Sequence, residues 1–241
     1  MPPWFSFMSV LDNVAEVRER IASAAHRSGR TLDDIALMAV SKTHPPERIR
    51  EAYDAGQRLF GENRVQEFSG KSNGLADLRN AEWHLIGHLQ TNKAAKAVEL
   101  FYAVDSVDSL KLAEKLDVAA RNLGRRLGVL IEVNVGGEAA KSGVAPDSSA
   151  LEEVLLAAPR LEALDYRGLM TVPPFTDDPQ QARPYFRKLR ELRDAIAARK
   201  LPEVAMDQLS IGMSHDFEVA IEEGSTCVRV GTAIFGKRAK P

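Results

Sequence analysis

The sequence predicts an α/β protein folded as a single (β/α)8 barrel, with an additional helix before the first strand. Short, nearly continuous apolar runs alternate evenly with amphipathic stretches, as expected for parallel strands covered on both faces. The length of 241 residues is also close to that of typical barrels. A doubly wound open sheet would show a similar alternation. The barrel is preferred because the repeat is even and no Gly-x-Gly-x-x-Gly motif follows the first run.

Eight apolar runs are predicted as strands, and each ends in polar or glycine residues that begin a loop. In chain order they are residues 35–40, 58–61, 83–87, 101–104, 129–135, 166–170, 208–211 and 227–230.

Helices are predicted between these runs from their start and stop residues. Proline opens and glycine closes the second helix, serine or aspartate precedes the later ones, and an apolar stripe marks the longest. The predicted helices are residues 10–28, 47–55, 110–123, 180–200 and 217–223.

Composition excludes several classes of protein. Lys and Arg total 32 against 34 Asp and Glu, so a broad basic surface for nucleic acid is not expected. The single cysteine, Cys227, rules out an intramolecular disulfide framework. The apolar runs are far shorter than the roughly 20 residues of a membrane-spanning helix. We expect a cytoplasmic protein, with residues 1–10 as a flexible arm and residues 11–241 as one domain.

Lys42 is the first candidate for chemistry, because strand C-terminal ends gather the active site of a barrel. It follows the first predicted strand with only Ser41 between them, so its amine would stand at the mouth of an apolar barrel. Desolvation lowers the pKa of an amine and frees it to attack a carbonyl carbon. The alternative is a lysine that reaches solvent or pairs with a carboxylate such as Glu62.

Two segments contain glycine near a strand end. Residues 210–216 span the end of the seventh predicted strand, and residues 229–236 span the end of the eighth. The loops after these strands form the usual phosphate-binding corner of a barrel. Gly212 and Gly231 let backbone amides approach an anion closely, and Ser214 opens a helix whose dipole favours negative charge. The pair of segments predicts a phosphate site, although either glycine alone would serve an ordinary turn.

A reactive amine facing a phosphate site indicates a ligand that carries both an aldehyde and a phosphate. Pyridoxal 5′-phosphate (PLP) meets both requirements, and so does a sugar phosphate held by an aldolase-like lysine. No metal site is expected, because His84 and His88 straddle a predicted strand and its loop instead of sharing a helix face.

Long, ordered motifs occupy residues 39–43, 60–67, 83–93, 209–216 and 228–236. They resemble the pyridoxal phosphate homeostasis protein family, and the likeness runs from about Leu11 to Gly236. The resemblance implies a fold-type III PLP barrel like the N-terminal domain of alanine racemase. It also implies a protein that holds PLP as a Schiff base and buffers it or delivers it to apo PLP-dependent enzymes, with little or no turnover.

The resemblance assigns cofactor-binding roles to nine residues. Lys42 would carry PLP covalently, Arg229 would face the pyridine nitrogen, and Asn63 would lie near the ring hydroxyl. The phosphate would be held by Ser214, Gly231 and Thr232, with Ser210, Gly212 and Met213 nearby. An arginine donates to the ring nitrogen without giving up its proton, which disfavours carbanion chemistry and leaves imine exchange unaffected.

Two enzymatic functions remain as alternatives. An amino-acid racemase would need acid–base groups on both faces of the cofactor, and none of the four tyrosines is predicted at a strand end. A Schiff-base aldolase would use Lys42 on a sugar phosphate. We expect a protein that is not an enzyme. We also expect a monomer, because the second domain of the racemases has no counterpart after the last predicted strand.

Overall fold

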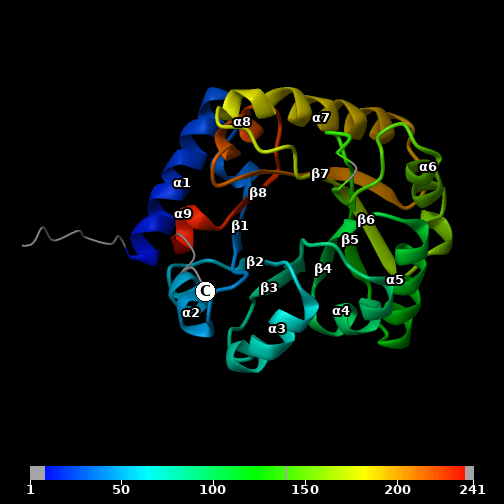
Figure 1. Ribbon diagram of the computed structural model, residues 1–241, viewed down its shortest axis with the longest axis horizontal. Coiled ribbons are helices and arrows are strands. Elements are labelled where there is room, and N and C mark those ends of the chain that lie inside the picture. Colours follow the sequence, from blue (N-terminus) through cyan, green and yellow to red (C-terminus); the bar gives the residue numbers. More distant parts are fainter. Residues whose placement is uncertain (1–8, 139, 237–241) are drawn as a thin grey trace, which may run out of the picture.

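The computed structural model describes residues 9–138 and 140–236. Within these ranges the strands close into a parallel barrel in chain order, and β1 pairs with β8. Figure 1 shows the helices arranged around the strands. This confirms the predicted barrel and excludes the open sheet. The strands are β1 Ala36–Val40, β2 Leu59–Glu62, β3 Glu82–Leu85, β4 Ala103–Val107, β5 Leu127–Glu132, β6 Leu164–Met170, β7 Val204–Met213 and β8 Cys227–Val230.

The additional N-terminal helix is confirmed as α1, and Ser9 caps it by accepting a hydrogen bond from the Asp12 amide. The predicted flexible arm lies outside the described residues, except for Ser9 and Val10, which cap and begin α1. The predicted helix at residues 180–200 is a 3-10 turn, Pro179–Ala182, followed by α7. The α-helices of the described ranges are α1 Val10–Arg27, α2 Pro46–Asp54, α3 Val65–Lys71, α4 Ala94–Leu100, α5 Leu110–Asn122, α6 Ser149–Leu156, α7 Arg183–Ala198, α8 Phe217–Glu222 and α9 Thr232–Phe235.

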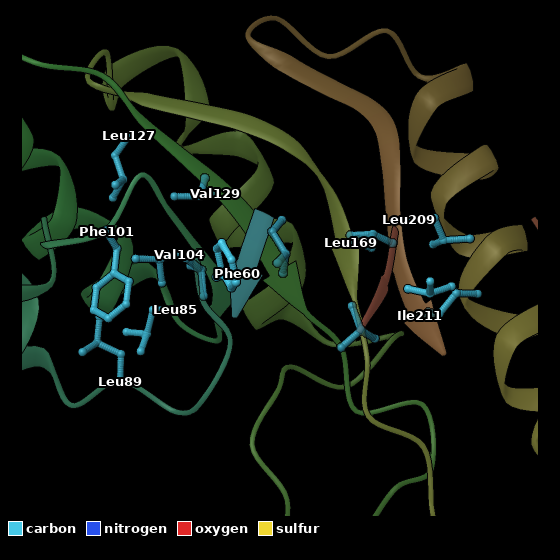
Figure 2. Packing of buried hydrophobic residues seen from close by; sticks show 14 of the residues in the cluster. Phe60, Leu85, Leu89, Phe101, Val104, Leu127, Val129, Leu169, Leu209 and Ile211 are labelled. Carbon is cyan, nitrogen blue, oxygen red and sulfur yellow. The ribbon is translucent and has the colours of Figure 1, made fainter. Parts of the chain in front are cut away.

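The apolar core lies between the strands and the surrounding helices. In Figure 2, Leu85, Leu89 and Phe101 lie together, while Leu209 and Ile211 of β7 point toward the neighbouring helix. All five side chains are buried, and burying each contributes roughly 1.5–3 kcal/mol. Because side chains alternate between the two faces of a strand, Ser210, which lies between Leu209 and Ile211 on β7, points into the barrel.

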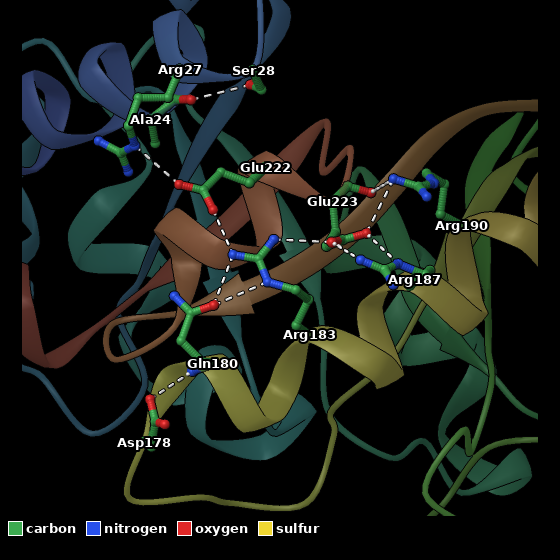
Figure 3. A network of polar contacts seen from close by, with 10 residues as sticks. All are labelled: Ala24, Arg27, Ser28, Asp178, Gln180, Arg183, Arg187, Arg190, Glu222 and Glu223. Carbon is green, nitrogen blue, oxygen red and sulfur yellow. Dashed lines mark hydrogen bonds and ion pairs between the residues drawn. The ribbon is translucent and has the colours of Figure 1, made fainter.

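A cluster of ion pairs fixes α8, the helix that follows the predicted phosphate segment. Figure 3 shows three arginines of α7 converging on Glu223, which directly follows α8. The closest distances from Arg183, Arg187 and Arg190 to the Glu223 carboxylate are 3.0, 2.9 and 3.1 Å. The Glu223 side chain is only 4% exposed, so these pairs lie in a partly desolvated setting. They hold α8 against α7.

Candidate functional site

A cavity of about 540 Å³ opens at the C-terminal ends of the strands. This volume lies within the roughly 300–1,000 Å³ range of small-molecule sites. Seven of the nine predicted cofactor-binding residues line it, namely Lys42, Asn63, Met213, Ser214, Arg229, Gly231 and Thr232. The barrel therefore brings the predicted amine and the predicted phosphate segments to one cavity, although they lie at opposite ends of the sequence.

Ser214 joins the segment after β7 to the segment after β8. Its Oγ accepts hydrogen bonds from the backbone amides of Gly231, at 3.1 Å, and Ala233, at 3.3 Å. A Cβ on Gly231 would lie only 3.3 Å from the Val40 carbonyl oxygen, so a larger residue would push this backbone away from β1. The result is a corner of the cavity where a hydroxyl and two amides lie together.

Ser210 and Gly212 are the two predicted residues that do not line the cavity. Ser210 is fully buried, and its Oγ accepts a hydrogen bond from Arg229 Nη1 at 2.8 Å. Gly212 has a φ of +92°, and a Cβ there would lie 2.6 Å from the Ala220 Cβ. Both residues lie behind the cavity wall, where Ser210 supports Arg229 and Gly212 lets the segment pack against α8.

Arg229 presents a fixed guanidinium to the cavity. Nη1 donates to the Ser210 carbonyl oxygen at 2.6 Å, and Nη2 donates to the Thr171 carbonyl oxygen at 2.7 Å. The residue is 3% exposed. Burial lowers the pKa of Arg229, and the nearby Cys227 and Asp105 oppose that effect. A guanidinium has donors and no acceptor, so this wall of the cavity can only donate hydrogen bonds.

Lys42 lies in a turn, residues 41–44, that follows β1. The side chain is half-buried and lines the cavity. The turn is closed by a hydrogen bond from the His44 amide to the Ser41 carbonyl oxygen, at 3.2 Å. The His44 ring stacks on Phe235 of α9 with 4.7 Å between ring centroids. This stacking ties the turn that carries Lys42 to the helix that follows Gly231.

Comparisons with known proteins identify the family of this chain. The sequence model of the family described as alanine racemase, N-terminal domain, matches residues 13–239. A pyridoxal phosphate homeostasis protein of Aquifex aeolicus is 48% identical over 96% of this chain and 99% of its own length. The chain belongs to the pyridoxal phosphate homeostasis protein family.

Solved structures show the same fold. The structure of PipY from Synechococcus elongatus with PLP bound is 37% identical, with a TM-score of 0.80, and the match covers 95% of this chain and all of PipY. An alanine racemase of Streptomyces coelicolor is 21% identical, with a TM-score of 0.68, over 93% of this chain and 59% of the racemase. At that identity the likeness to the racemase extends to the fold alone.

In this member of the homeostasis protein family, Glu132 is a cavity residue that sequence reasoning missed. The fifth strand was predicted to run to residue 135, which placed Asn134 at its end, but β5 ends at Glu132. Asn134 instead donates from Nδ2 to the Glu138 carbonyl oxygen at 2.9 Å. Burial raises the pKa of Glu132, whose Oε1 accepts a hydrogen bond from Ser142 at 3.1 Å. The available signal was a carboxylate in the middle of the apolar run at residues 129–135.

The two histidines considered for metal binding have other partners. His84 Nδ1 lies 3.0 Å from Asp105 inside the protein, and His88 Nδ1 lies 3.0 Å from Asp108. Of the two, only His88 lines the cavity. Across residues 9–138 and 140–236, no group of three or more His, Cys, Asp or Glu could hold a metal ion.

In the same ranges, residues 9–138 and 140–236, no helix is long and apolar enough to cross a membrane. No tyrosine of these ranges lines the cavity.

Proposed function

We propose that this protein binds PLP in the cavity, holds it on Lys42 and releases it to other proteins, with little or no catalytic turnover. One observation carries the proposal: Lys42 and the donor-rich corner at Ser214 and Gly231 line the same cavity. The name of the Aquifex relative and the PLP bound in PipY support it. We expect the protein to act in the cytoplasm as a monomer and to pass PLP to apo PLP-dependent enzymes.

The residues at the cavity fit this cofactor. A phosphate ester accepts hydrogen bonds, and the Ser214 hydroxyl, whose oxygen accepts from two backbone amides, keeps its own O–H to donate. Among the described lining residues, the cations Lys42, Lys141 and Arg229 outnumber the one carboxylate, Glu132. An excess of positive charge favours a doubly negative phosphate. When bound, PLP supplies an aldehyde that condenses reversibly with primary amines.

Each residue then has a defined part. Lys42 would supply the amine, while the hydroxyls of Ser214 and Thr232 and the backbone at Gly231 would hold the phosphate. Arg229 would donate to the ring nitrogen and leave it unprotonated, because a guanidinium does not release its proton. An unprotonated ring is a weaker electron acceptor than a protonated one. The site is therefore suited to holding an aldehyde and poorly suited to carbanion chemistry.

Borohydride trapping with peptide mapping tests this proposal. We expect the purified protein, incubated with PLP and reduced, to carry the label on Lys42. Lys42→Ala should abolish that label. Lys96→Ala is the matched control, since Lys96 pairs with Glu99 on the surface and its side chain is 52% exposed. A label that persists at the wild-type level in Lys42→Ala would refute the assignment.

Two assays separate the enzymatic alternatives. Optical rotation of L-amino acids incubated with the PLP-loaded protein tests for racemisation. Turnover faster than about one per second, near the low end of ordinary enzymes, would favour a racemase over a storage protein. Complete failure of PLP to label the wild-type protein would instead favour an aldolase acting on a sugar phosphate.

A further inference from the structure

A buried ion cluster lies beneath the turn that carries Lys42. Lys71, the last residue of α3, lies 2.8 Å from the carboxylate of Glu62 at the end of β2. Its Nζ is also 3.2 Å from Glu67 Oε1. The side chains of Lys71 and Glu62 are 9% and 0% exposed, so the pair is almost completely removed from water. Neither residue lines the cavity or takes part in the proposed contacts to PLP.

Lys71 contacts both ends of the turn. Its Nζ donates to the carbonyl oxygen of Ser41 at 3.0 Å and to that of His44 at 3.4 Å. These two carbonyl groups belong to the first and last residues of the turn, and Lys42 lies between them. Ser41 Oγ in turn donates to Glu62 Oε1 at 2.5 Å. One ammonium group therefore links the whole turn to the ends of β2 and α3.

The backbone next to Lys42 requires such support. Thr43 has a φ of +67°, and a β-branched residue in this left-handed region is strained by about 1–3 kcal/mol. Strained conformations persist only where the surrounding structure fixes them. Here the Thr43 amide donates to Glu67 Oε1 at 2.5 Å, and Glu67 is in turn held by Lys71. The cluster thus fixes the conformation that follows Lys42 directly.

Stability alone does not account for this cluster. A buried ion pair loses its hydration, and well-packed apolar residues of similar volume are often equally or more stabilising. Burial raises the pKa of Glu62, although Lys71 opposes that effect, so the pair sits in a costly environment. The distinctive property of the cluster is geometric. The ammonium group of Lys71 contacts oxygens from three segments, namely the end of β2, helix α3 and the turn that carries Lys42.

We propose that Lys71 is a positioning residue which, with Glu62 and Glu67, orients the turn so that the Lys42 amine faces an aldehyde bound in the cavity. The inference rests on the proposed function, which gives the Lys42 amine its role. In that condensation a carbon–nitrogen double bond forms. The aldehyde oxygen leaves as water with the two hydrogens of the neutral amine. Misplacement of the amine by about 1 Å slows such a step by as much as 100-fold.

Lys71→Met tests the inference through two measurements on the same protein. The first is the rate at which PLP labels Lys42, followed by borohydride quenching at successive times. The second is the calorimetric affinity for pyridoxine 5′-phosphate, which has an alcohol in place of the aldehyde. We expect labelling to slow by about tenfold or more and the affinity to stay unchanged. The control, Lys96→Met, should change neither value.

Two further variants guard against misfolding. Lys71→Met combined with Glu62→Gln avoids a buried carboxylate without its cation. Glu67→Met removes the acceptor of the Thr43 amide at a residue whose side chain is 29% exposed. Both should slow labelling and leave the pyridoxine 5′-phosphate affinity unchanged.

The outcomes separate this inference from the proposed function. Labelling of the Lys71 variants at the wild-type rate would overturn the inference alone. A parallel loss of pyridoxine 5′-phosphate affinity would also overturn it, because the cluster would then support the whole cavity instead of the turn. Absence of label on Lys42 in the wild-type protein would overturn the proposed function and this inference together.

Discussion

Gly212 offers the sharpest test of how the corner of the cavity around Ser214 is built. Its φ is +92°, and a Cβ would lie 2.6 Å from the Ala220 Cβ and 2.9 Å from the Phe217 Cα in α8. The left-handed backbone costs an L-residue about 1–2 kcal/mol, and forced close contacts cost about 1–3 kcal/mol. We therefore expect Gly212→Ala to lower the free energy of unfolding by about 3 kcal/mol. The melting temperature should fall by roughly 6–12 °C.

Gly29→Ala is the matched control. Gly29 also has a positive φ, +69°, but nothing lies within 4 Å of the position that a Cβ would occupy, so only backbone strain applies. Urea unfolding of both variants should give a loss of about 1–2 kcal/mol for Gly29→Ala and a larger loss for Gly212→Ala. Calorimetry should show weaker pyridoxine 5′-phosphate binding in Gly212→Ala alone. Equal destabilisation of the two variants would refute the packing argument.

Two further predictions concern the dependence of stability on pH. Burial raises the pKa of Glu223, but hydrogen bonds from Arg187 and Arg183 outweigh it and hold the pKa below its ordinary value. Its stabilisation is therefore present above an ordinary carboxyl pKa of about 4.3 and is lost as the pH falls through the lower folded-state value. Glu223→Gln should be less stable at neutral pH by about 2 kcal/mol and should lose this acid-side slope in urea unfolding. Burial raises the pKa of Glu132. Its contribution to folding stability is therefore complete below the ordinary carboxyl pKa, and it is lost as the pH rises through the raised folded-state value. Glu132→Gln should therefore unfold at higher urea than the wild type at pH 8, and an unchanged midpoint there would contradict the assigned burial.

Much of the fold could be predicted from the pattern of apolar runs, because buried strands leave a continuous signal. The strand at residues 208–211 was predicted too short, since β7 begins at Val204. Its first half alternates between buried and exposed residues, with Met206 buried and Asp207 exposed, so no continuous run is visible there. Helices α3, α4, α6 and α9 were not predicted. They have between four and eight residues, and helices this short depend on tertiary packing.

The candidate site was partly predictable for a similar reason. Gly231 directly follows an apolar run and Lys42 follows one after a single serine, so their place at the cavity could be expected from the fold. The role of Lys71 could not, because it depends on α3 reaching back to a turn some thirty residues earlier in the chain. Gly212 and Ser210 belong to a matching motif but lie behind the cavity wall, and a motif alone does not distinguish a lining residue from its support.

Closure of the barrel has a consequence for biosynthesis. The first strand pairs with the last, and Met38 lies opposite Arg229. During translation Lys42 emerges long before β8, the strand that completes the barrel and its cavity. Under the proposed function, a nascent chain on the ribosome carries Lys42 without Gly231 and Thr232, so we expect it to hold PLP only once synthesis is nearly complete.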